Sequence, residues 1–299
     1  MEDAGIRFES HPIHQRWFHL LEPTAAQTQQ ILTELDLPED FFEELLVADQ
    51  SPRLERSGSY VLLVMQLPWR DPGEPVGECV LRPLAILLGE GRIWSFSNVS
   101  WPFLDAWQAR KFDDPRAVLV WFFQGLSQSY QRTISRLQQQ ILLVESRLNV
   151  TQQTADFYEM LHLSKALTRF YVALSSNIVI IFKVSRSRTL AWSEGGRSAL
   201  NLAIADLQHA RDRAQISAET AANMMDAYAG MVQININHGL KILTVLALVL
   251  YVPSLVATIF GVNVPLLEQK SHWTAWVALA VAFLISLVMS IRFKRRGWL

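Results

Sequence analysis

The segment that decides the fold is Ile242–Phe260, ILTVLALVLYVPSLVATIF, which is followed at once by Gly261-Val262-Asn263. It contains 19 residues without a charged side chain, and a second uncharged segment of 19 residues, Trp273–Ile291, begins after a gap of 12. At 1.5 Å per residue each helix would be about 28 Å long, close to the roughly 30 Å hydrocarbon core of a bilayer. The two segments predict a transmembrane helical hairpin. A pair of buried core helices is the alternative.

The charges around these segments predict how the hairpin is oriented. Four basic residues follow the second segment within five positions: Arg292, Lys294, Arg295 and Arg296. The connecting segment 261–272 carries only two charged residues, Glu268 and Lys270. The positive-inside rule therefore places the basic tail 292–299 in the cytoplasm and the segment 261–272 in a periplasmic loop. With two spans, the N-terminus is expected in the cytoplasm too.

The overall composition excludes several classes of protein. The 299 residues hold 27 Lys+Arg and 28 Asp+Glu, a formal net charge of -1, which lacks the basic excess expected of a nucleic-acid binder. A lone cysteine, Cys79, excludes an intrachain disulfide and any multi-cysteine metal site. No nucleophile elbow, P-loop, dinucleotide fingerprint or paired-histidine zinc-protease motif occurs. We expect no enzyme, no cofactor and no nucleic-acid partner.

Proline divides the remainder of the chain into two parts. Ten of the 12 prolines lie within residues 12–115, and none lies between residues 116 and 252. Proline lacks a backbone N–H and clashes inside a helix, so long helices are expected only where it is absent. The sequence therefore predicts a cytoplasmic α/β domain over residues 1–115 and long helices after it.

Within residues 1–115, local patterns predict strands and helices. Apolar runs predict strands at Ser59–Leu67, Leu84–Leu88 and Arg92–Ser97. The last two flank Gly89-Glu90-Gly91, which is typical of a hairpin turn. Helices are expected at Thr24–Leu35 and Pro38–Ala48, the second with an acidic first turn.

After residue 115 the hydrophobic period becomes helical. Apolar residues recur at alternating steps of three and four: Ile134, Leu137, Ile141, Val144 and Leu148. With a second helical stretch at 155–185, this predicts a cytoplasmic helical hairpin over residues 116–197, broken at Gly195-Gly196. From 198 to 260 we expect one stalk helix that continues into the first transmembrane span at about 240–260. The second span is expected at 273–291.

The first span has a polar face. Its polar residues follow one another at steps of seven, seven, three and four, and Leu240, Ala247 and Gly261 fall on the same side of the helix. The hydroxyls could bond to their own helix or join two helices. We favour the alternative that several copies around an axis point this stripe into a shared lumen. The predicted pore-lining residues are Asn237, Leu240, Thr244, Ala247, Tyr251, Ser254 and Thr258.

The segment after the first span has the chemistry of an ion filter. Gly261 permits a sharp turn, and Asn263 offers a carbonyl and an amide without charge. A ring of such side chains can bond to the water shell of a divalent cation without stripping it. Gly-x-Asn alone is a weak signal, because three residues recur by chance. No resident metal site is assigned.

Position and order make these motifs resemble the CorA superfamily of pentameric divalent-cation channels and transporters. The resemblance covers essentially the whole chain and rests on Arg82–Gly89, Met225–Tyr228, Lys241–Thr244, Ile259–Asn263 and the tail Phe293–Leu299. It implies an α+β membrane protein: a cytoplasmic α/β/α domain, a helical hairpin and a long stalk helix leading into a two-helix transmembrane segment. It also implies a funnel-shaped homopentamer in the lipid bilayer of the inner membrane.

The resemblance also assigns roles to particular residues. It implies that Gly261, Val262 and Asn263 form a selectivity filter, with Glu268 and His272 in the loop at the outer mouth. Asn263 would ring the outer mouth, Asn237 would lie near the cytoplasmic entrance, and Leu240 would belong to a hydrophobic constriction.

The magnesium channels of the superfamily typically have Gly-Met-Asn where this chain has Val262 in the middle, as in the ZntB-like branch. Val262 thus favours Zn²⁺ or another transition metal over Mg²⁺ as the substrate. The rival hypothesis is a non-transporting, membrane-anchored cytoplasmic scaffold or sensor with the same architecture.

Overall fold

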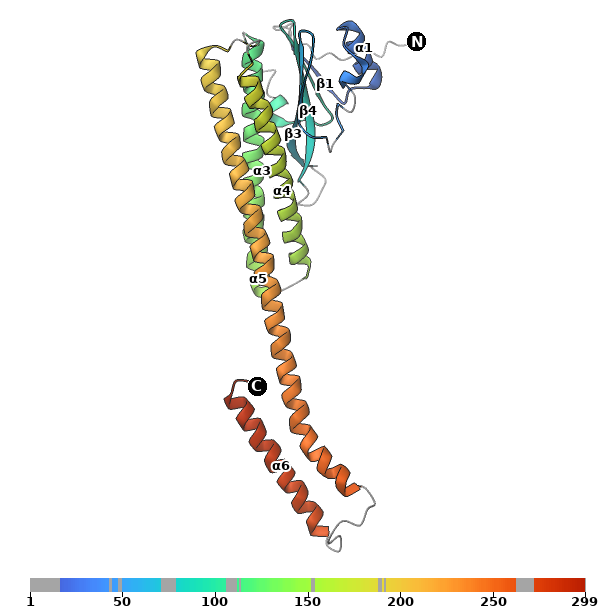
Figure 1. Cartoon of the computed structure of the whole chain (residues 1–299), viewed down its shortest axis with the longest axis vertical. Helices are drawn as coiled ribbons and strands as arrows, with labels where there is room; N and C mark the ends of the chain where they lie inside the picture. The colour runs from blue at the N-terminus through green and yellow to red at the C-terminus, as the bar shows by residue number, and fades with distance from the viewer. Residues whose placement is uncertain are drawn as a thin grey trace. The chain divides into compact units, whose positions relative to one another are not determined.

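The structure is a computed structural model of the whole chain (Figure 1). It describes residues 17–42, 45–47, 50–70, 79–105, 112, 114–151, 154–187, 190, 192–261 and 272–298. The chain divides into two compact units, residues 1–225 and 226–299.

The first unit is built on a five-stranded sheet in the order β1-β5-β4-β3-β2. Its strands are β1 (Trp17–Leu21), β2 (Arg53–Ser57), β3 (Tyr60–Arg70), β4 (Cys79–Gly89) and β5 (Arg92–Ser97). β1 runs parallel to β5, and the other neighbours are antiparallel. The three expected strands are present, β3 and β4 being longer than predicted. β1 and β2 were not predicted because each is only five residues long and neither alternates apolar with polar residues.

The β4–β5 hairpin turns at the predicted glycines. Glu90 (φ 49°) and Gly91 (φ 72°) both adopt positive φ, which is the geometry of a type I′ turn. The preceding Gly89 serves another purpose: a Cβ added there would lie 2.0 Å from Cδ1 of Tyr60. The glycine therefore makes room for the buried Tyr60 ring.

Replacing Gly89 with alanine is expected to destabilise the first unit by about 2 kcal/mol, because the Tyr60 ring must leave its packed position. Thermal unfolding of the full-length variant would measure the loss. In a Tyr60→Leu background the same replacement should cost less. Equal costs in the two backgrounds would show that Tyr60 is not the obstacle.

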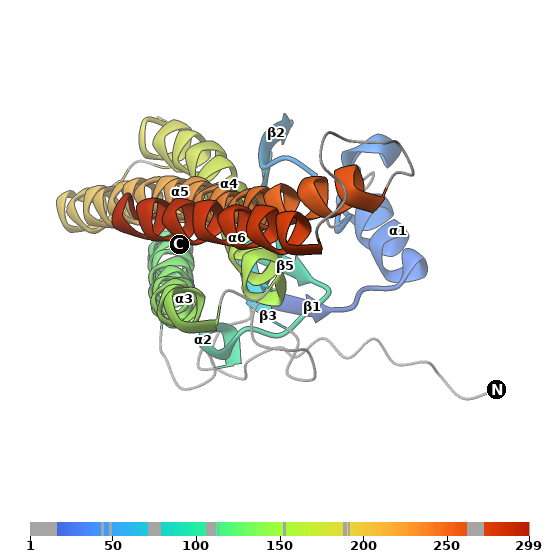
Figure 2. The ribbon, with the colours of Figure 1, turned by 90° about the horizontal axis from the view of Figure 1, so that it is seen from below.

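Helices cover both faces of the sheet, giving three layers (Figures 1 and 2). On one face lie α1 (Ala25–Glu34) and the short 3-10 helix η1 (Glu39–Phe42). α1 begins with a capping box, in which Thr24 and Gln27 satisfy each other's backbone N–H groups. The apolar side chains of α1 and η1 pack on the sheet and form a buried core with it. This core includes Ile31, Leu32, Phe41, Phe42, Leu62, Val64, Ala85, Leu87 and Phe96.

The helix expected at Pro38–Ala48 is wrong in length. Regular structure there is limited to η1, and residues 43, 44, 48 and 49 lie outside the described residues. The adjacent rings of Phe41 and Phe42 are both buried, and Phe42 meets Phe96 edge-on at a centroid distance of 5.2 Å. Tertiary burial of two neighbouring aromatic rings overrides the helical pattern of the sequence.

The opposite face of the sheet is covered by α3 (Pro115–Thr151) and α4 (Thr154–Ser185), with the short α2 (Pro102–Asp105) before them. The five apolar residues of the predicted stripe in α3 are all buried. α5 (Glu194–Gly261) follows as one helix of 68 residues. Gly195-Gly196 does not break it but lies in its first turn, where the hydroxyl oxygen of Ser193 accepts a hydrogen bond from the Gly196 N–H at 3.1 Å.

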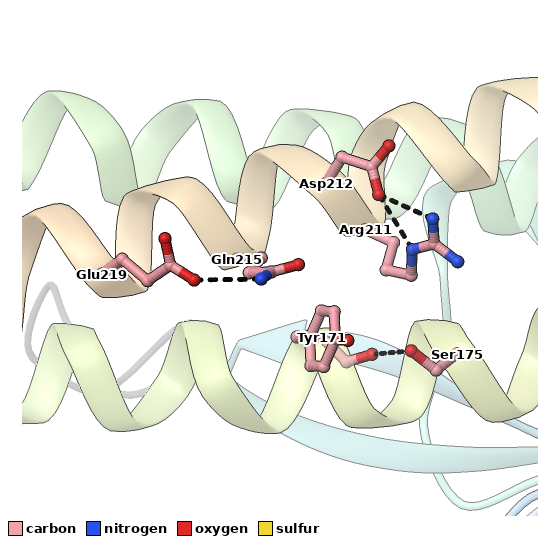
Figure 3. A network of polar contacts seen from close by, with 6 residues as sticks. All are labelled: Tyr171, Ser175, Arg211, Asp212, Gln215 and Glu219. Carbon is pink, nitrogen blue, oxygen red and sulfur yellow. Dashed lines mark hydrogen bonds and ion pairs between the residues drawn. The ribbon is translucent and has the colours of Figure 1, made fainter.

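The first part of α5 packs against both α3 and α4. Ser217 accepts a hydrogen bond from the Gln138 amide of α3 at 2.7 Å, and the Ser164 hydroxyl of α4 donates to the Ala218 carbonyl at 3.4 Å. Small side chains in the contact allow close approach: Ala203, Ala210, Ala214 and Ala221 are all buried. Other polar contacts, such as Arg211–Asp212 on α5 and Ser175–Tyr171 on α4, stay within one helix (Figure 3).

Candidate functional site

The second unit is formed by the end of α5 and by α6 (His272–Arg295). Three helices of the described chain are long and apolar enough to cross a membrane: α4, α5 and α6. In the most apolar stretch of 18 residues, 44% is buried in α4, 6% in α5 and 11% in α6. α4 therefore belongs to the core of the first unit. The alternative of two buried core helices requires the most apolar stretches of α5 and α6 to be buried. In the single chain, few residues of either stretch are buried.

α6 contacts α5 through a face of small residues. At steps of four along α6 lie Ala278, Ala282, Ser286 and Ser290, of which Ala282 is 1% exposed and Ser286 5%. The most buried side chain in the apolar part of α5 is Val245, at 1% exposed. Small side chains allow backbones to approach closely, which is how helices associate in lipid. This face was not predicted, although its small residues recur at steps of four in the sequence.

The predicted polar stripe lies on the far side of α5 from α6. The half-buried and buried side chains of the span are Val245, Val249, Val252, Pro253 and Val256. At 100° per residue the valines are centred about 150° around the helix from the stripe. All seven predicted pore-lining residues are exposed: Asn237, Leu240, Thr244, Ala247, Tyr251, Ser254 and Thr258. Within one chain, therefore, the stripe does not join the two helices.

Hydrogen bonds along the stripe orient two of its hydroxyl groups. The Thr244 hydroxyl donates to the Leu240 carbonyl and the Thr258 hydroxyl to the Ser254 carbonyl, each at 2.8 Å. The alternative that hydroxyls bond to their own helix is therefore true of both threonines. Because the proton is committed to the helix, each oxygen faces outward as an acceptor. A surface of acceptor oxygens suits the water molecules around a cation. Hydroxyls that bond to their own helix are therefore compatible with a stripe that lines a pore.

The predicted filter is only partly within the described residues. Gly261 is the last residue of α5, and α5 continues through Pro253 to reach it. Val262, Asn263 and Glu268 lie outside the described residues, and for His272 the structure gives only its place as the first residue of α6. In the part of one chain that is described, no three His, Cys, Asp or Glu side chains come together as a metal site.

A capping motif closes the C-terminal end of α6. The N–H of Trp298 donates to the Phe293 carbonyl and the N–H of Gly297 to the Lys294 carbonyl, both at 3.1 Å. Gly297 has a φ of 70°, and the Phe293 and Trp298 rings are in contact with centroids 5.6 Å apart. This is a Schellman motif with its hydrophobic contact. It fixes the turn in which the basic residues of the tail stand.

Comparison with known proteins identifies the architecture. The family described as CorA-like Mg2+ transporter protein matches residues 14–295. The cobalt/magnesium transport protein CorA of Methanocaldococcus jannaschii is 23% identical over 301 residues, covering 98% of this chain and 94% of that protein.

Solved structures agree on the fold. The complete CorA magnesium transporter from the same organism superposes with a TM-score of 0.82 at 18% identity, covering 95% of this chain and 91% of the other. The ZntB cytoplasmic domain from Vibrio parahaemolyticus gives a TM-score of 0.60 at 11% identity, covering 73% and 87%. With a family match over nearly all of its length, an α/β domain, long helices and an apolar C-terminal hairpin, this chain belongs to the CorA-like Mg2+ transporter family.

Proposed function

We propose that the protein is a divalent metal cation channel or transporter of the inner membrane. It acts as a homopentamer, with the ion path on the five-fold axis and lined by the transmembrane part of α5. The observation that carries this proposal is the placement of the polar stripe opposite α6, where one chain leaves it exposed.

In a single chain surrounded by lipid, the outward-facing polar atoms of the stripe would meet hydrocarbon, although the protons of the two threonine hydroxyls are bonded to the helix. Polar side chains within a membrane face other protein or a water-filled cavity, because hydrocarbon offers no hydrogen-bond partners. The valine face of α5 is buried within the chain, and other copies of α5 around an axis would cover the stripe. The name of the Methanocaldococcus jannaschii relative, a cobalt/magnesium transport protein, supports the same function.

The remaining roles follow the path of the ion. Asn237 lies near the cytoplasmic entrance, Leu240 narrows the pore, and Gly261, Val262 and Asn263 select the hydrated cation at the outer mouth. Glu268 and His272 belong to the loop around that mouth. Both ends of the chain face the cytoplasm, and the basic cap after α6 interacts with the inner leaflet.

Val262 favours Zn²⁺ or another transition metal over Mg²⁺, and the Methanocaldococcus jannaschii relative is named for one ion of each kind, cobalt and magnesium. Flux measured in liposomes that contain the purified protein decides between these ions. We expect saturable entry of at least one of Zn²⁺, Co²⁺ and Mg²⁺. No flux of any of the three, from an intact oligomer and under several pH gradients, would favour the membrane-anchored scaffold or sensor instead.

A matched pair of leucines tests whether the stripe lines the pore. Leu240 and Leu243 are both exposed, at 54% and 62%, but only Leu240 lies on the stripe. Widening a hydrophobic constriction eases its wetting, so Leu240→Ala should raise the flux roughly threefold or more, with Leu243→Ala unchanged. Initial rates of ion entry into liposomes measure both. A larger effect of Leu243→Ala would place the lumen on another face of α5.

A further inference from the structure

The sheet of the first unit leaves an opening where its edge strand is short. β2 pairs with β3 only between the Arg53–Val64 and Ser57–Tyr60 positions, whereas β3 continues to Arg70. Beyond that ladder, the side chain of Asn177 from α4 bonds to the backbone of Gln66 in place of a strand. A hollow of about 480 Å³ lies beside this contact. Its walls are the segment 50–52, the start of β4 at 80–82 and the residues 168–176 of α4.

The charged groups of this hollow are two arginines from different elements, Arg82 of β4 and Arg169 of α4. None of the described residues that line it is an aspartate or a glutamate. The Arg82 guanidinium lies over the Trp69 ring, 5.7 Å from its centroid, so its orientation is restrained. Two guanidinium groups without an acidic residue in the same wall favour an anion, and their forked N–H donors match phosphate oxygens.

The remainder of the lining is mixed. Val172 of α4 is 58% exposed at the hollow, and Val80 and Leu81 add apolar surface on the β4 side. Hydroxyls of Ser176 and Thr168 stand among them, and the Thr168 hydroxyl donates to the Ser164 carbonyl at 2.9 Å, so that its oxygen is left to accept. Sites for small molecules combine a volume of roughly 300 to 1,000 Å³ with apolar walls and a few polar groups.

We propose that this hollow is a binding site for a small phosphate monoester with a partly apolar body, of the size of a mononucleotide. The phosphate lies between Arg82 and Arg169, and the body lies against Val172. The proposal goes beyond cation transport and does not depend on the identity of the transported ion.

The test is equilibrium binding of AMP to the purified full-length protein in a buffer free of divalent cations, so that the ion path does not contribute. We expect saturable binding with one site per chain. Loss of one charged contact to a phosphate should weaken the affinity about tenfold, so Arg169→Gln is expected to do so. Because Arg169 is exposed, this replacement should leave the fold unchanged. Arg82→Lys, which keeps the charge but removes the fork, should weaken binding less.

The matched control is Lys183→Gln on the same helix, which removes one exposed positive charge outside the hollow. Adenosine, which lacks the phosphate, should bind at least about tenfold more weakly than AMP. Absence of saturable AMP binding at millimolar concentration would overturn the proposal. So would equal affinities of the wild-type and Arg169→Gln proteins, or equal losses in Arg169→Gln and Lys183→Gln.

Discussion

The Asn263→Ala protein is expected to transport at least about tenfold more slowly than wild type, or to lose its choice among ions, while its oligomer remains intact. The reason is the proposed role of the carboxamide, which bonds to the water shell of the cation from each subunit at the outer mouth. Alanine leaves the ring without side-chain donors or acceptors. Uptake of Zn²⁺, Co²⁺ and Mg²⁺ into liposomes measures the rate, and size-exclusion chromatography measures the oligomer.

The control for this variant is Asn201→Ala, which removes an exposed carboxamide from the first part of α5. Its flux should equal that of the wild type. Unchanged transport by the Asn263→Ala protein, with all three ions at wild-type rates, would refute the filter assignment. It would not by itself refute the path along α5, which the Leu240 and Leu243 variants test separately.

Asn177→Leu is expected to cause the largest loss of stability, about 3 kcal/mol. The Asn177 amide donates to the Gln66 carbonyl at 2.8 Å, and its oxygen accepts from the Gln66 N–H at 3.2 Å. The carboxamide thus replaces the peptide group that a longer β2 would have supplied. Leucine would leave a buried N–H without its acceptor. For a unit of this size, Tm falls by about 2 to 4 °C for each kcal/mol of lost stability. The Tm of the full-length protein should therefore fall by about 6 to 12 °C.

A second donor to the same carbonyl allows a graded comparison. The Tyr130 hydroxyl also donates to the Gln66 oxygen, at 2.8 Å. Burial raises the pKa of the Tyr130 phenol far above its ordinary value, so the group stays a protonated donor. Tyr130→Phe removes one of two donors and should cost only about 1 kcal/mol. If Asn177→Leu were no more destabilising than Asn201→Leu at an exposed site, the contact with Gln66 would not be stabilising the sheet.

The features predicted correctly from the sequence have signals that are local and periodic. The stripe from Ile134 to Leu148 is buried as its three-four spacing requires, because helical periodicity alone fixes which side faces the core. The transmembrane hairpin was predicted from two uncharged segments, each of which is long enough on its own to span the hydrocarbon core of a bilayer. The polar face of the first span is exposed on one side of α5 for the same geometric reason.

Features that depend on distant partners were not predicted. Asn177 and Gln66 are 111 residues apart, and nothing near either residue indicates that one completes the backbone of the other. β2 exists as a strand because β3 beside it offers an open edge, not because RLERS resembles a strand. The Gly-Val-Asn filter depends on position and on the family resemblance, since three residues alone specify no structure. It stays a prediction.

The placement of α6 behind α5 has a genetic consequence. If five subunits surround the proposed lumen, each supplies one wall of it and one Asn263 to the proposed filter ring, so that one altered chain breaks the ring. If wild-type and Asn263→Ala chains were expressed equally and mixed at random in a five-membered ring, roughly 3% of the rings would be wholly wild type. A non-conducting allele of this protein should therefore be dominant over the normal one, even in a cell that still makes half of its normal subunits.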